Sequence, residues 1–200
     1  MIKKIFTFIF SFLMLVLFVS SITQAQTTKT SGEKYPVFSI SPMGGVQFPL
    51  GDMNNTYKTS WDAGVDFNLK INRETSFWLF AGYHDMPAKT EANIPSASVI
   101  QITAGPRYIF TSKAIKSMFF LEGGLGVYIF TTKDFVSTGT AETIAGSSKT
   151  NFGINVGPGA IIPLGKAMDL IMKVKLHDMF MEGGSQTFIS AVMGLNFKFN

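Results

Sequence analysis

The chain contains no cysteine, which excludes disulfides, iron–sulfur clusters and thiolate zinc sites. A strong excess of charge of one sign is missing as well. The 200 residues carry 17 Lys and Arg against 13 Asp and Glu, with no basic run or stripe that would bind nucleic acid. Phosphate loops, dinucleotide fingerprints and EF-hand loops are missing too. We therefore expect no nucleic-acid partner and no cofactor.

Long apolar runs are also missing, except at the start of the chain. Lys3 and Lys4 precede an apolar stretch over 5–19, and small residues stand at Thr23 and Ala25. This pattern predicts a secretory signal peptide over 1–25, cleaved after Ala25, and a short periplasmic lead over 26–36. An uncleaved anchor helix is the alternative, because the apolar stretch to Ile22 is nearly long enough to span a bilayer.

What the rest of the chain does have is alternation of apolar and polar residues. From Trp61 to Ile71 every odd position is apolar, and every even position is polar or Gly. A helix would scatter Asp62, Asp66 and Lys70 among the apolar groups, whereas a strand places all three on one face. The segment is therefore predicted to be a β-strand.

The same alternation recurs along the chain and predicts an all-β fold of eight antiparallel strands. They are expected near 37–48, 61–71, 75–84, 98–110, 118–131, 151–162, 167–177 and 187–199. Short connections at 72–74, 111–117 and 163–166 alternate with mostly longer, polar ones near 49–60, 85–97, 132–150 and 178–186. Short turns on one side and long loops on the other are typical of up-and-down transmembrane barrels, with the turns in the periplasm.

The two strand faces distinguish a membrane barrel from a soluble sandwich. The polar face is rich in Gly and carries both signs of charge, as suits the crowded interior of a narrow barrel. The apolar face carries aromatic residues towards the strand ends, where membrane barrels place aromatic girdles. A soluble sandwich with an aromatic core remains the alternative.

Several Gly-spaced segments carry a family resemblance. They are Gly44-Gly45-Val46, Phe48-Pro49-Leu50-Gly51-Asp52, Glu122-Gly123-Gly124-Leu125-Gly126, Val156-Gly157-Pro158-Gly159-Ala160 and Gly194-Leu195-Asn196-Phe197-Lys198-Phe199. With these, 37–200 resembles the outer membrane protein β-barrel domain family, small OmpA/OmpX-like eight-stranded barrels. The resemblance implies an outer-membrane location, contact with lipid, and recognition by the barrel-insertion machinery through a terminal aromatic residue. In this chain Asn200 follows Phe199. The family implies no single activity.

Catalytic candidates are few, because the chain has only two His. His84 and His177 each begin a His-Asp-Met tripeptide at the loop ends of the third and seventh strands. We expect them on opposite walls of the same rim, too far apart to share one metal ion, and we assign no metal site. A lipid-modifying barrel enzyme resembling the barrel deacylases would need a Ser two residues after the His, and neither His has one. We predict no catalytic residue and no enzyme activity.

Arg107 and Glu122 are predicted to form a luminal ion pair, because both face inward on consecutive strands and nearly oppose each other across the turn. The alternative is that each pairs with another neighbour, such as Lys173 or Asp169. Either arrangement would seal the barrel. Three functions stay open: a structural or surface-interaction role, a narrow channel, and a lipid-modifying enzyme. An extracellular ligand would bind the loops near 49–60 and 132–150.

Overall fold

The structure is a computed structural model that describes residues 35–89, 94–110, 117–136 and 143–199. The predicted signal peptide, 1–25, and nearly all of the predicted lead lie outside the described residues. The elements are β1 (Val37–Pro49), α2 (Asp52–Thr56), β2 (Ser60–Lys70), β3 (Thr75–Met86), β4 (Ala97–Phe110), β5 (Met118–Thr132), β6 (Phe135–Val136), β7 (Thr143–Ile144), β8 (Ser148–Pro163), β9 (Met168–Met181) and β10 (Gly184–Phe199).

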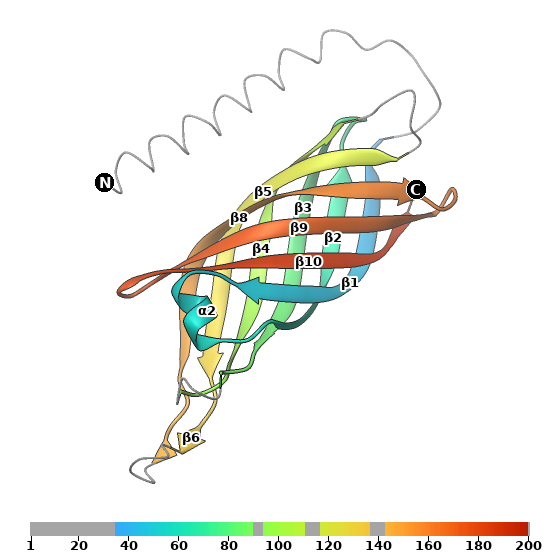
Figure 1. Cartoon of the computed structure of the whole chain (residues 1–200). Coiled ribbons are helices and arrows are strands. Elements are labelled where there is room, and N and C mark those ends of the chain that lie inside the picture. Colours follow the sequence, from blue (N-terminus) through green and yellow to red (C-terminus); the bar gives the residue numbers. More distant parts are fainter. Residues whose placement is uncertain (1–34, 90–93, 111–116, 137–142, 200) are drawn as a thin grey trace. The chain divides into compact units, whose positions relative to one another are not determined.

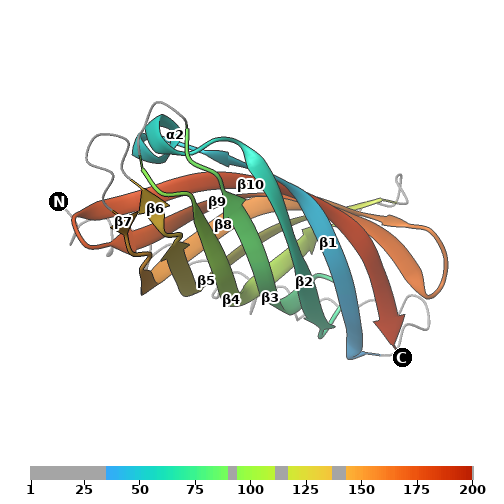
Figure 2. The ribbon, with the colours of Figure 1, turned by 90° about the horizontal axis from the view of Figure 1, so that it is seen from below.

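Eight of these strands close into one barrel in the order β1-β10-β9-β8-β5-β4-β3-β2, and every neighbouring pair is antiparallel. Figures 1 and 2 show the strands tilted around this barrel, with α2 and the β6–β7 hairpin at one end and the end of β10 at the other. We call the end with α2 the loop end and the opposite end the turn end. The predicted eight-stranded, up-and-down barrel is confirmed.

The strand register explains the tilt. Following the register from Val37 around the barrel leads through Lys70, Ser76, Arg107, Glu122, Gly157, Lys175 and Ser190 back to Gln47 in the same strand. Gly157 and Lys175 are aligned by the flanking pairs Val156–Leu176 and Gly159–Lys173. One circuit therefore advances ten residues along β1. Because stagger and tilt are linked in a closed sheet, the strands cross the barrel obliquely.

The connections at the loop end differ from one another. The first contains α2, and the third contains the two-stranded β6–β7 hairpin. The expectation of a long loop over 178–186 is wrong, because β9 and β10 pair as far as Met181 and Gly184. Only Glu182 and Gly183 remain as a tight turn, and Gly183 has φ 90°, a conformation that favours glycine. Within the described residues, no helix is long and apolar enough to cross a bilayer.

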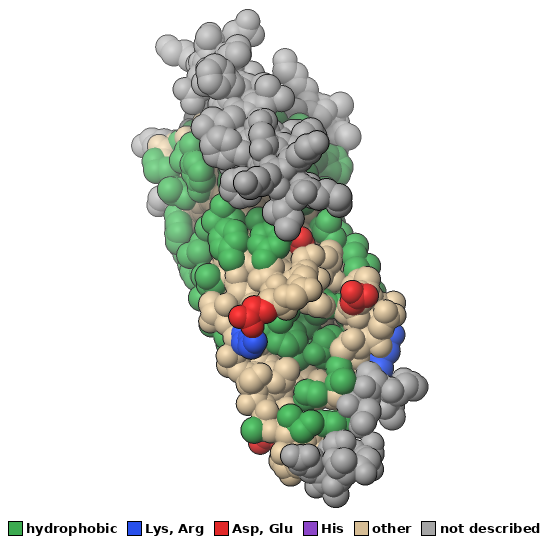
Figure 3. Space-filling model, turned by 90° about the vertical axis from the view of Figure 1, so that its left-hand side faces the viewer, with side chains coloured by type: hydrophobic (Ala, Val, Ile, Leu, Met, Phe, Trp, Pro, Cys, Tyr) green, Lys and Arg blue, Asp and Glu red, His purple; other side chains and the backbone are tan. Residues whose placement is uncertain are grey.

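The outer face of the barrel is apolar. Large hydrophobic side chains on every barrel strand are exposed, among them Trp61, Phe77, Phe119, Leu125 and Phe152. On the face in Figure 3, hydrophobic side chains gather on the upper part, and most visible charged side chains lie lower. Such a belt in water would be an unusually large apolar patch, but it suits contact with lipid acyl chains.

The inner face is less uniformly polar than the alternation predicted. One apolar cluster inside the barrel contains Met43, Trp78, Phe80, Ile109, Phe120, Ile161, Ile171 and Val192. A Cβ on Gly124 would meet the Trp78 ring, and one on Gly159 would meet the Phe120 ring. Inward glycines therefore make the space that inward aromatic rings fill. The alternation in β3 already indicates that an aromatic ring lies inside. Phe77 and Leu79 point outward, so Trp78 between them points to the inner face.

Candidate functional site in the barrel lumen

A network of buried charges occupies the middle of the lumen. The register pairs Arg107 on β4 with Glu122 on β5, so the two side chains start side by side. The Arg107 guanidinium donates from Nε to Glu122 Oε2 at 2.7 Å, and its Nη2 lies 2.6 Å from the same oxygen. Nη2 also donates to Asp66 Oδ2 at 2.9 Å. One guanidinium thus binds carboxylates from β2 and β5, and ties together strands that are not neighbours.

Two lysines of β9 complete this network. Lys175 Nζ lies 2.9 Å and Lys173 Nζ 3.3 Å from Glu122 Oε1, and Lys173 Nζ also donates to Asp66. The network therefore holds three cations and two carboxylates. Aromatic faces stabilise the excess positive charge: Lys175 Nζ lies 3.5 Å from the centroid of Trp78, and the Arg107 guanidinium lies 4.4 Å from that of Phe120.

Arg107 and Glu122 form an ion pair with each other, and each also has a further partner. The structure brings the two residues together and adds Lys173, one of the alternative partners. Asp169 is not in this network, because it accepts from Asn196 Nδ2 at 3.1 Å and from Lys198 Nζ at 2.8 Å nearer the turn end.

His84 on β3 and His177 on β9 lie on opposite walls, as expected, but their rings meet across the lumen. Their ring centroids are 5.7 Å apart, and each residue is about 1% exposed. The expectation of distant, rim-exposed imidazoles is therefore wrong. The reason is that eight strands leave a narrow interior, which two facing rings can cross. Phe188 contacts both, at centroid distances of 5.0 Å from His84 and 4.5 Å from His177.

His177 also forms a hydrogen-bonded pair with a serine that was not predicted from the sequence. Its Nε2 lies 2.9 Å from Ser190 Oγ, and its Nδ1 lies 3.1 Å from the Tyr128 hydroxyl. The His-x-Ser pattern covers only a Ser of the same strand, whereas the β9–β10 register brings in one from the neighbouring strand. Both residues are buried, and within the described part of the chain no carboxylate forms an ion pair with this imidazole. The pair lacks the access to substrate and the orienting acid that acyl transfer requires.

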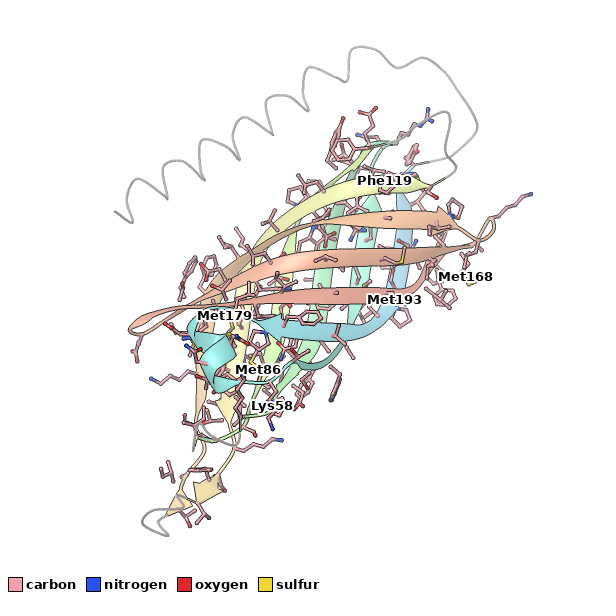
Figure 4. The ribbon with its side chains drawn as sticks, viewed as in Figure 1. Lys58, Met86, Phe119, Met168, Met179 and Met193 are labelled. Carbon is pink, nitrogen blue, oxygen red and sulfur yellow. The ribbon has the colours of Figure 1, made fainter. Side chains whose placement is uncertain are left out.

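The helix α2 closes the loop end. Met53 and Tyr57 are buried against Met86, Ala97, Val99, Tyr128, Met179 and Phe188. Figure 4 shows Met86 and Met179 beside α2, whereas Phe119 and Met168 lie toward the turn end. Lys58 N donates to Pro87 O at 2.9 Å, and Lys89 N donates to Thr56 O at the same distance. Burial raises the pKa of the Tyr57 hydroxyl, so this side chain stays neutral in the cap.

The lumen therefore has two seals, an ionic one at its centre and an apolar one beneath α2. Among the residues that the structure describes, no group of three or more His, Asp or Glu side chains is arranged to hold a metal ion.

Comparison with known proteins agrees with this architecture. No family profile and no curated protein matches the sequence. Among solved structures, Neisserial surface protein A superimposes with a TM-score of 0.63 at 12% identity, covering 82% of this chain and 97% of that chain. OprG from Pseudomonas aeruginosa gives 0.55 at 15% identity, covering 84% and 98%. Ail, the attachment invasion locus protein of Yersinia pestis, gives 0.51 at 13% identity, covering 82% and 100%. The chain thus has the fold of the small outer-membrane β-barrels.

Proposed function

We propose that this protein is a non-enzymatic, integral outer-membrane barrel that acts structurally or through surface interactions at its loop end. The observation that carries the proposal is the doubly sealed lumen. A solute would have to displace both the charged network around Arg107 and the apolar cap around Met53. The apolar belt faces lipid, the loop end faces outward and the turn end faces the periplasm.

The loop end offers the surface for an interaction. β5 and β8 pair as far as Thr131 and Ser148, and β6 and β7 follow between them with exposed Val136 and Ile144. Within 132–150, residues 137–142 lie outside the described ones. Ail, the attachment invasion locus protein, has the same fold, which supports an attachment role for these loops.

Conductance across planar bilayers tests the sealed lumen. Purified full-length protein should insert without a steady open state, because both seals lie within the barrel. A reproducible unitary conductance would overturn this part of the proposal and favour the narrow channel. Arg107→Ser would then be the variant in which to look for a larger conductance.

Attachment and lipid analysis test the remaining parts. Non-adherent Gram-negative cells that express the protein should gain attachment to protein-coated surfaces, and exchange of 132–150 for a Gly-Ser linker should abolish the gain. No gain, at wild-type levels of folded barrel, would leave only the structural role. The lipid mass spectrum of the membranes should be unchanged by expression. New lyso- or deacylated lipids would contradict the non-enzymatic assignment.

A further inference from the structure

Beneath the α2 cap, three buried polar side chains present four polar atoms that have no hydrogen-bond partner. They are both carboxylate oxygens of Asp62, Nδ1 of His84 and Oε1 of Gln47. The three residues are 3%, 1% and 0% exposed, respectively. Buried polar groups in folded proteins almost always have a partner, so an unpaired set of this kind points to a bound ion or molecule.

These side chains come from three adjacent strands. The β2–β3 register begins with the pair Asp62 and His84, and Gly45 on β1 is paired with Asp62 from the other side. Gln47 reaches across the open end of this ladder, where its Nε2 donates to Asp85 O at 2.5 Å. Its amide therefore lies at the backbone of the residue that follows His84.

The hydrogen bonds around His84 leave its Nδ1 on the side of Asp62. The Gln101 amide donates through Nε2 to Thr103 Oγ1 at 2.6 Å, which leaves its Oε1 as the acceptor 2.8 Å from His84 Nε2. His84 Nε2 therefore donates its N–H to this amide oxygen, and the other ring nitrogen, Nδ1, faces the Asp62 carboxylate. A histidine that binds a metal ion through one nitrogen usually donates its other N–H to a carbonyl or carboxylate in this way.

A cation at this point would also balance the charge of Asp62. Among the described residues, His84 is the only basic side chain within ion-pair distance of Asp62. Arg107, Lys173 and Lys175 contact Asp66 and Glu122 instead. A buried carboxylate without a cation would be strongly destabilising.

The spacing of the two central atoms fits a shared metal ion, and the imidazole ligand favours a transition metal over calcium or magnesium. His84 Nδ1 and Asp62 Oδ2 are 3.5 Å apart and form no hydrogen bond. Nitrogen and oxygen ligands on one tetrahedral zinc ion, at their usual bond lengths, are about 3.4 Å apart. We propose that Asp62, His84 and Gln47 bind one divalent transition-metal ion of the zinc class, which joins β1, β2 and β3 beneath the cap. This inference goes beyond the proposed function and does not depend on it.

Zinc titration of the tag-free, full-length chain, refolded in detergent without metal, tests the proposal. We expect one Zn²⁺ per chain by calorimetry. Asp62→Asn and His84→Gln should each weaken binding at least about 100-fold, more than loss of a residue that only supports a ligand. Gln47→Met, which keeps the side-chain length, should weaken binding about tenfold. Heat-modifiable migration on a gel establishes that each variant has folded.

His177→Gln is the matched control, because it removes the neighbouring imidazole, whose two nitrogens already have partners. It should bind Zn²⁺ as the wild type does. The electron paramagnetic resonance spectrum of bound Cu²⁺ should show nitrogen coupling that is lost in His84→Gln and kept in His177→Gln. Absence of a stoichiometric ion in the folded wild type, or equal affinity in folded Asp62→Asn, would overturn the site and leave a buried proton-sharing pair.

Discussion

At the scale of single residues, the lumen shows how buried charges are tolerated. Arg107 contacts both carboxylates of the central network, so each of them has a guanidinium partner in addition to lysine. Removing one member of a buried ion network costs far more than its net contribution, because the remaining charges lose their partner without regaining water. The guanidinium should therefore be the most sensitive position in the barrel interior.

We predict that Arg107→Ala lowers the free energy of unfolding by about 3–5 kcal/mol, measured by urea titration of the barrel in lipid vesicles. The triple variant Arg107→Met, Glu122→Met and Lys175→Met should recover most of this loss, since the remaining Lys173 and Asp66 still pair with each other. Lys149→Ala, which breaks the exposed ion pair with Glu182, should cause no measurable change. A small effect of Arg107→Ala would mean that water enters the lumen freely.

The sequence could predict which face a residue lies on, but not the contacts that depend on the barrel's width and stagger. Alternation put Arg107, Glu122, His84 and His177 on the inner face, because side-chain direction has a period of two in any strand. The distance between His84 and His177 depends instead on how far opposite walls lie apart, which no local pattern contains. Asp62 was likewise placed inside, but the lack of hydrogen bonds to its carboxylate could be recognised only from the structure.

At the scale of elements, α2 is the one helix among the described residues, and it has only five. A helix this short is marginal by itself in water, so its stability must come from packing. Met53 supplies that packing by inserting into the apolar cluster at the loop end.

We predict that Met53→Asp releases the α2 segment while the barrel stays folded. Loss of a buried methionine side chain favours the open segment by about 1.5–3 kcal/mol. Trypsin should then cleave after Lys58 at least about tenfold faster, a factor that corresponds to about 1.4 kcal/mol, followed by mass spectrometry. Asn54→Asp adds the same charge at the exposed next position and should cleave at the wild-type rate. Equal rates in both variants would show that Met53 does not hold the cap.

The central part of β2 tests the assignment of the two faces. Val65→Arg places a charge on the outer face and should cost roughly 2–4 kcal/mol of stability in lipid vesicles. Asn68→Ser, on the inner face of the same strand, should cost much less, since it loses one 3.3 Å hydrogen bond from Arg107. Equal costs would show that the outer face does not contact lipid.

The bounds of most strands could be predicted within a few residues, because each strand has one face directed into the barrel. The length of the last loop could not be predicted in this way. Polar residues such as Glu182 and Ser185 suggested a long connection over 178–186. The alternation of His177, Met179 and Met181 nevertheless continues through this segment, and the Gly183-Gly184 dipeptide is a usual sign of a tight hairpin.

At the scale of the whole molecule, closure of the barrel satisfies the backbone hydrogen bonds of every strand within the sheet. Such a barrel resists detergent until it is heated. We predict that unboiled membrane fractions migrate faster on a denaturing gel than boiled ones. Recovery of the processed chain from periplasmic extract without detergent, with one mobility in both conditions, would contradict the membrane assignment.

The seam between β1 and β10 has a consequence for assembly. Its pairs, such as Phe38 with Phe199, join the two extremes of the barrel sequence, so this ladder cannot form until the last strand exists. Before then, two unpaired strand edges would face hydrocarbon, where no water is present to form hydrogen bonds with their backbone amides. A partial barrel is therefore not a stable intermediate in the bilayer, and the whole chain inserts only when the final strand pairs. A chain that ends before β10 should accumulate outside the membrane and be degraded by proteases.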